Sequence, residues 1–299
     1  MQLEKKDADL FYKLYKPLLV YANKKGKISK DINKTEDIDM RKVEGKYLVE
    51  IRDYICDHPE IIDSYVEENQ EKFSDEELTI IKIWEDFVRK EFYIIEHMKE
   101  HTAFFDGSKD GKIYGVLGLY SPLENIVEYI PCIVKAVLLP FKEQIIYDGL
   151  IAPYSVRFGP TMRKDLMMDY NEIKAKFGII TSLPFSPKER KESDENLLKF
   201  YLKTQKNREL YYKEIQDLKS KNKGLLTIYY QETGKHNATE YSKKLREFIA
   251  GNTTVWFALI DDVVVASGKT QQDVEKNLDN TISGEKRNFA HIFKITGKK

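Results

Sequence analysis

The spacing of apolar residues changes near Thr102, and this change constrains the fold more than any other feature of the sequence. Before it, apolar residues recur three and four positions apart and glycine is rare, which predicts helices. After it, apolar and polar residues alternate and Gly and Pro become frequent, which predicts strands joined by turns. We therefore expect an α+β protein with a helical N-terminal region over residues 1–101.

This N-terminal region is expected to be helical throughout. Its first apolar stripe contains Pro17, which lacks the amide that a helix interior uses, so a kink is expected there. A later helix should start at the capping box formed by Ser74 and Glu77 and run through His101. Glu91 falls inside the apolar stripe of that helix, so we expect it to form a buried ion pair, with a functional site as the alternative.

Residues 102–184 are expected to form a small antiparallel β-sheet or barrel with short inserted helices. Turn residues such as Asp148-Gly149 separate the strands. Gly159-Pro160 opens a helix that should continue to about Phe177. The expected strands are TAFFD, KIYGVLGL, CIVKAVLL, IIYD and LIAPYSVRF.

The remaining residues are expected to form a strut and a terminal module. Residues 185–235 should hold a long charged helix over 188–222 and a strand in GLLTIYYQ. The helix has one narrow apolar face, which either packs on its own domain or forms a homodimer with a second copy. Residues 236–299 predict an α-ββαβ module: a helix capped by Asn237, a hairpin of TVWFALI and VVVAS, a helix starting at Thr270, and the strand NFAHIFKI.

The segment VWFALIDDVVVASGKTQQDVEKNL resembles a small prokaryotic ββαβ domain of unknown function, whose pattern is roughly W-V-A-L-x-D-G-x-V-V-A-S-G-K followed by a helix. The resemblance covers about residues 252–296 and departs from the pattern at Asp262, where a glycine is usual. The segment VKAVLLPFKEQIIYDGLI is similar to part of uncharacterised prokaryotic proteins. Neither resemblance implies an activity.

Charge and hydropathy limit the classes of partner. Lys+Arg and Asp+Glu each total 49, so no long-range field of one sign favours polyanions or acidic membranes. The N-terminus lacks the order of a signal peptide, and the most apolar run is too short and too interrupted to span a bilayer, so we expect no membrane partner and a cytoplasmic location. Cys56 and Cys132 are expected to be buried thiols.

The stretch HMKEH at 97–101 has the H-x-x-E-H order of inverted zinc metallopeptidases. If it bound zinc, His97 and His101 would be ligands, Glu172 the third ligand from a later helix, and Glu100 the base that takes a proton from zinc-bound water. On the expected helix, however, both histidines lie off the apolar stripe and in the last turn, where exposed carbonyls favour cationic side chains without a metal. A zinc-dependent hydrolase is therefore an alternative and not the preferred function.

Three further patterns have simpler explanations. The stretch DGSKDG at 106–111 opens like a calcium loop but has Leu117 where a bidentate Glu is needed, so a hairpin turn is expected. The stretch SGKT at 267–270 lacks the first glycine of a phosphate-binding loop, so helix capping by Thr270 is expected. Lysine clusters near tyrosines would suit single-stranded nucleic acid, but acidic runs lie as close to other aromatics.

No set of chemical groups converges in the sequence. We therefore expect a binding or adaptor protein without catalytic activity or cofactor, whose partner is another protein. A zinc hydrolase and a nucleic-acid-binding protein remain the alternatives.

Overall fold

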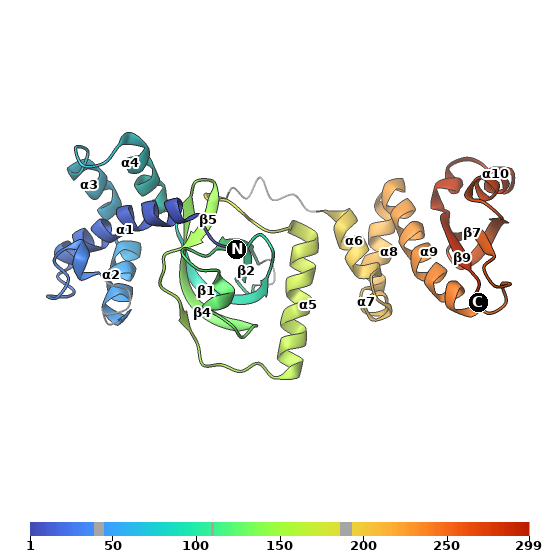
Figure 1. Ribbon diagram of the computed structural model, residues 1–299, viewed down its shortest axis with the longest axis horizontal. Coiled ribbons are helices and arrows are strands. Elements are labelled where there is room, and N and C mark those ends of the chain that lie inside the picture. The colour runs from blue at the N-terminus through green and yellow to red at the C-terminus, as the bar shows by residue number, and fades with distance from the viewer. Residues whose placement is uncertain (39–44, 109–110, 186–192, 299) are drawn as a thin grey trace. The chain divides into compact units, whose positions relative to one another are not determined.

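The computed structural model describes residues 1–38, 45–108, 111–185 and 193–298 (Figure 1). The chain is an α+β protein, and it divides into two compact units, Met1–Lys191 and Glu192–Lys299. None of the helices in the described ranges combines the length and the apolar character needed to cross a bilayer.

Four α-helices and two 3-10 turns begin the first unit. The capping box at Ser74 is confirmed: Glu77 N donates to Ser74 Oγ at 3.3 Å, and Ser74 N donates to Glu77 Oε2 at 3.2 Å. The helices are α1 (Lys5–Gly26), α2 (Gly45–Asp57), α3 (Glu60–Glu68) and α4 (Asp75–Lys82), and the 3-10 turns are η1 (Thr35–Asp37) and η2 (Ile83–Asp86).

The prediction that the capped helix runs through His101 was wrong. It ends at Lys82, and residues Val88–His97 form strand β1. The second half of β1 is buried on both faces, with Phe92 and Ile94 in the main core and Ile95 in a second cluster against a later helix. A strand covered on both sides has a nearly continuous apolar run, which lacks the alternation that identifies a half-exposed strand.

Strands β1 to β5 close into a barrel in the order β1-β2-β3-β5-β4, with β4 returning to pair with β1. β3 and β5 are parallel, so the prediction of an antiparallel sheet was wrong for this pair. This closed order, with its one parallel pair, is that of an OB-fold barrel. The strands that follow β1 are β2 (Thr102–Phe105), β3 (Ile113–Leu117), β4 (Cys132–Phe141), β5 (Gln144–Tyr147) and the short β6 (Ala152–Pro153), with the 3-10 turn η3 (Leu123–Asn125) between β3 and β4.

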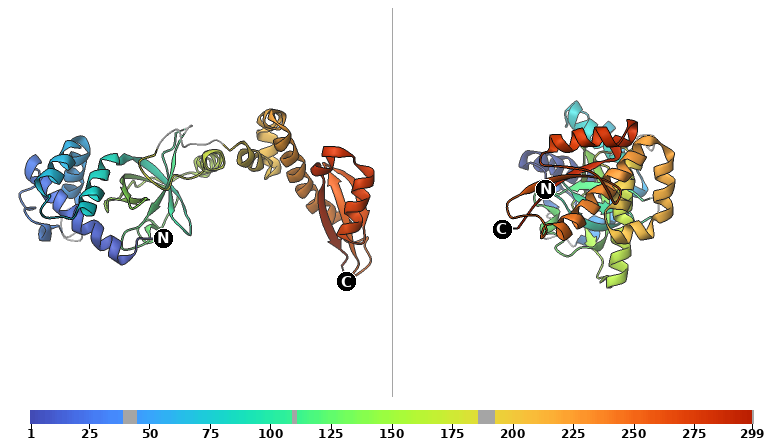
Figure 2. Two further views of the ribbon diagram at one scale, coloured as in Figure 1. Left: turned by 90° about the horizontal axis from the view of Figure 1, so that it is seen from above. Right: turned by 90° about the vertical axis from the view of Figure 1, so that its right-hand side faces the viewer.

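Helices cover the barrel on two sides. Helices α1–α4 gather at one end, and α5 (Pro160–Phe177), which has the predicted bounds, runs along the other side (Figures 1 and 2). One apolar core continues from α1–α4 into the barrel, so the regions predicted as 1–101 and 102–184 are packed together. Tyr170 and Ile173 of α5 pack on the second cluster, which contains Phe105 of β2 and Ile113 of β3.

A buried ion pair joins the helices to the barrel. Arg52 of α2 donates from Nη1 to Asp148 Oδ2 at 2.9 Å, and the side chains are 2% and 0% exposed. Asp148 follows β5, and its Oδ1 also accepts from Leu150 N at 3.1 Å. Asp53 accepts from Arg52 Nε at 2.8 Å and from Lys135 of β4 at 2.9 Å, which extends the pair toward the surface.

The second unit consists of a helical part and a three-stranded sheet in the order β8-β7-β9. The hairpin β7–β8 and the Thr270 cap are confirmed, since Asp273 N donates to Thr270 Oγ1 at 3.1 Å. Helix α10 contacts the sheet mainly at β8, and helix α9 contacts it mainly at β9. The elements are α6 (Asp194–Leu202), α7 (Gln205–Leu210), α8 (Tyr212–Lys221), α9 (Lys223–Leu245), β7 (Thr254–Ile260), β8 (Val263–Gly268), α10 (Gln271–Thr281), the 3-10 turn η5 (Gly284–Phe289) and β9 (His291–Thr296).

Three predictions for this unit were wrong. The single helix over 188–222 is divided into α6, α7 and α8, because Thr204 caps a new helix and the chain turns again at Tyr211; residues 188–192 lie outside the described residues. The predicted strand GLLTIYYQ lies in α9, which Asn222 caps by accepting from Leu225 N at 2.9 Å. Asn237 does not cap a helix, because it lies inside α9 and donates to Asp261 O at 2.8 Å.

Candidate functional site

The predicted zinc motif lies on a β-hairpin and not on a helix. His97 ends β1 and pairs with Thr102 of β2, and Met98 N donates to His101 O at 2.9 Å. Both ring nitrogens of His97 have partners: Nδ1 lies 3.1 Å from Thr102 Oγ1, and Nε2 lies 2.9 Å from Val127 O. Because a carbonyl only accepts, Nε2 is the donor. His97 thus ties the hairpin to the β3–β4 connection.

The other predicted zinc residues are not brought together with His97. The ring of His101 lies against Gly115, where a Cβ would be 2.8 Å from the ring. Its Nε2 is buried without a hydrogen-bond partner among the described residues, and burial lowers the pKa of His101. Glu100 is exposed in the turn and Glu172 lies on α5. Within the described ranges, no three His, Cys, Asp or Glu side chains are placed to hold a metal ion.

Glu91 also differs from its prediction. On strand β1 it is exposed, and its carboxylate accepts a hydrogen bond from Tyr154 Oη. The expected buried ion pair was wrong, because neighbouring residues of a strand point to opposite faces and the helical stripe does not exist.

The predicted calcium loop is only partly described, since residues 109–110 lie outside the described ranges. Asp106 Oδ1 accepts from Ser108 Oγ and Lys112 N, both at 3.0 Å, and Oδ2 accepts from Lys90 at 3.1 Å. These bonds hold the ends of the β2–β3 turn together.

Three tyrosines near the lysine clusters, Tyr21, Tyr211 and Tyr230, contact neighbouring side chains. Tyr21 Oη donates to Glu68 at 2.8 Å, Tyr230 stacks on Phe289 at 4.7 Å, and Tyr211 stacks on Tyr201 at 4.1 Å. OB-fold barrels bind oligonucleotides mainly on the face of strands 2 and 3. Here residues of β2 and β3 on that side pack against α5.

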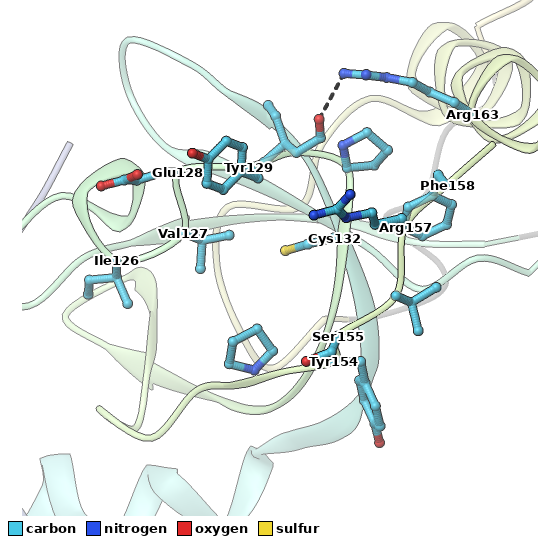
Figure 3. Close-up of a pocket in the computed structure, with 14 residues that line it drawn as sticks. Ile126, Val127, Glu128, Tyr129, Cys132, Tyr154, Ser155, Arg157, Phe158 and Arg163 are labelled. Carbon is cyan, nitrogen blue, oxygen red and sulfur yellow. Dashed lines mark hydrogen bonds between the residues drawn. The ribbon is translucent and has the colours of Figure 1, made fainter. Parts of the chain in front are cut away.

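A groove of about 710 Å³ opens on the surface of the first unit (Figure 3). One wall is the end of the β3–β4 connection, residues 126–132, and the other is the segment after β6, residues 153–158. Arg163 in the first turn of α5 completes it. Neither wall is a helix, and only their ends at Cys132 and Pro153 belong to strands.

Specific contacts hold both walls in place. The first wall is fixed by His97, through Val127 O, and by Arg163, whose Nη2 donates to Ile130 O at 2.8 Å. The second wall is fixed to β4 by Tyr154 N, which donates to Ile133 O at 2.9 Å, and to β1 by Phe158, whose ring lies 6.0 Å from that of Tyr93. The histidine that the sequence suggested as a zinc ligand therefore positions a wall of the groove.

The groove combines exposed apolar side chains with one arginine, Arg157, that has no partner among the described residues. Tyr129 is 84% exposed, Val156 48% and Ile126 46%, although side chains of these types are usually covered. The guanidinium of Arg157 lies between the walls (Figure 3), and it has no hydrogen-bond or ion-pair partner among the described residues. Burial raises the pKa of the Cys132 thiol in this groove to about 11, so it is protonated at neutral pH.

Sequence reasoning missed this site. The run IVEYIPCIVKAVLLPF is mostly apolar along its whole length, but Pro131 separates an exposed loop from strand β4. The available signal was the pair of prolines, Pro131 and Pro153, at the strand ends that border the groove.

Comparison of the chain with protein-family models finds no match, and comparisons with curated proteins and with solved structures find no significant match.

Proposed function

We propose that this chain is a binding protein, and that the groove between residues 126–132 and 153–158 holds an organic ligand with an apolar body. The observation that carries the proposal is the gathering of exposed apolar side chains, Tyr129, Val156 and Ile126, over a single hollow. Scattered exposed apolar residues need no explanation, but a cluster at a concave surface is typical of a ligand site. The volume of about 710 Å³ lies in the range of small-molecule sites.

The walls support binding because contacts outside the groove hold them. Arg163, His97 and Phe158 each fix a wall to a helix or a strand, so a ligand would not have to order both segments. Pre-ordered walls reduce the entropy lost on binding. The adaptor role and the protein partner expected from the sequence stay predictions.

Fragment screening by ligand-observed NMR on the full chain tests the proposal. Val156→Asp places a carboxylate in the groove at a side chain that is 48% exposed, so the fold should tolerate it. Val263→Asp is the matched control, because Val263 is 57% exposed and lies on β8 of the second unit. We expect aromatic or branched apolar fragments to bind the natural chain and Val263→Asp, and to lose at least about tenfold in affinity for Val156→Asp.

Equal binding to all three proteins would place the fragments elsewhere and would contradict the proposal. Absence of any binding fragment would contradict it as well.

A further inference from the structure

We infer that the ligand of this groove is a small organic acid with a single carboxylate, and that Arg157 binds this carboxylate. The inference rests on the proposed function and adds the chemical class of the ligand. It starts from the charged side chains that line the groove, which are Arg157, Arg163 and Glu128.

Of the two arginines, only Arg157 has its whole guanidinium free of hydrogen-bond and ion-pair partners among the described residues, whereas Arg163 keeps its charge but is held at one wall through Nη2. Arg163 already donates from Nη2 to Ile130 O, which fixes the wall. The carboxylate of Glu128 points outward, whereas the guanidinium of Arg157 lies between the walls (Figure 3). Arg157 is exposed and makes no hydrogen bond or ion pair with any residue that the structure describes.

A ligand that fills the groove displaces water from this guanidinium. A charged donor that loses its water without gaining a new acceptor is destabilised, so an apolar ligand that lacks an acceptor should bind less tightly beside Arg157 than one that carries an acceptor. A carboxylate replaces that water, because its two oxygens match two parallel N–H groups of a guanidinium.

The charge count also selects against more highly charged ligands. A nucleotide or another polyanion brings several negative charges, which need several cations or a metal ion. The groove offers one uncommitted guanidinium, and Glu128 at its rim would repel further negative charge. The best match is therefore a ligand with one carboxylate, which pairs with Arg157, and an aromatic or branched aliphatic body, which covers Ile126 and Val156.

The inference is tested with matched pairs of compounds on the full chain. Small aromatic and branched-chain acids, such as 4-phenylbutyrate, are titrated beside their primary amides by calorimetry or NMR. We expect each acid that binds to bind at least about tenfold more tightly than its amide, the ratio expected for a charge-assisted hydrogen bond. Arg157→Gln should reduce this ratio to about twofold or less.

Lys164→Gln is the control for a general loss of positive charge, because Lys164 is an exposed residue of α5 beside Arg163 and does not line the groove. It should leave the ratio within about twofold of the natural value. Because Arg157 is exposed, Arg157→Gln should unfold at the same denaturant concentration as the natural chain, which shows that any loss of binding is local.

Acids and amides that bind equally would overturn the inference and leave the proposed function standing. A preference that survives Arg157→Gln would also overturn it, as would tighter binding of phenyl phosphate or of an acidic peptide than of every small acid. If neither acids nor amides bind at millimolar concentration, the inference and the proposed function both fail.

Discussion

Arg52→Met tests whether the buried ion pair holds α1–α4 on the barrel. Methionine keeps the unbranched stem of Arg52 and removes its guanidinium. The Asp148 carboxylate then stays buried without its cationic partner, although the Leu150 amide still donates to it. Breaking one partner of a fully buried pair costs about 3–5 kcal/mol. For a unit of this size, that corresponds to a fall in melting temperature of roughly 10 °C.

The pH dependence makes this prediction specific to Asp148. Burial raises the pKa of Asp148 to about 6 from an ordinary 3.8, although the Arg52 guanidinium acts in the opposite direction. The ionised form is therefore disfavoured in the folded state. The stability that this carboxyl contributes is fully present below pH 3.8 and is lost as pH rises through about 6, in total about 3 kcal/mol.

In Arg52→Met the pKa of Asp148 should rise further, because the attraction of the guanidinium is gone. The natural chain reaches constant stability above about pH 6, whereas the variant continues to lose about 1.4 kcal/mol per pH unit until its own higher pKa. The gap between the two proteins should therefore widen from about pH 6 to about pH 8.

Urea unfolding followed by tryptophan fluorescence measures this gap. The chain has two tryptophans, and Trp84, which is 1% exposed, reports on the first unit once Trp256 is replaced by Phe. In the double variant Arg52→Met/Asp148→Asn the extra loss above about pH 6 should disappear. A loss of less than about 1 kcal/mol in Arg52→Met at neutral pH, or a gap that does not change with pH, would refute the reasoning.

Three further predictions concern local contacts. Ser74→Ala and Thr270→Ala each remove a confirmed helix cap and should each cost about 1 kcal/mol, seen only in the unfolding transition of the unit that contains the change. Gly234→Ala should cost about 1–2 kcal/mol in the second unit, because the added Cβ would lie 2.7 Å from His291 Cβ; unchanged stability would contradict the close packing of α9 on β9. Glu96→Gln removes the ion pair that fixes α5 to β1 and should speed hydrogen exchange of the α5 amides at neutral pH. The Lys174 hydrogen bond lowers the pKa of Glu96, so this contribution is present at neutral pH and lost as pH falls through that lowered pKa, where the natural chain should approach the variant.

The sequence predicted elements best where local chemistry determines them. The caps at Ser74 and Thr270 and the helix that starts at Pro160 depend on side chains and backbone within one turn, and all three are present. Strand β1 could not be identified by periodicity, because FYII is buried on both faces and fits a buried helix equally well. Its aromatic and β-branched residues were the remaining signal for a strand.

The groove depends on contacts between residues far apart in the sequence. The bond between His97 and Val127 joins residues thirty positions apart, and Arg163 reaches back thirty-three positions to Ile130. No local pattern encodes such contacts, so a sequence motif suggested a metal for a histidine that the fold uses as a hydrogen-bond donor. The GLLTIYYQ segment shows the same limit, because its β-forming residues lie in α9, where packing on α6 and α8 outweighs their propensity.

The Arg52–Asp148 pair also sets an order of events during synthesis. The two residues are 96 positions apart, so at about 5–20 residues per second the ribosome needs roughly 5–20 s to deliver the carboxylate after the guanidinium. During that interval Arg52 has only Asp53 of its own helix as an ion-pair partner, so burying its guanidinium in the final packing is unfavourable. Maturation of the N-terminal helices therefore has to wait for the strand that precedes Asp148.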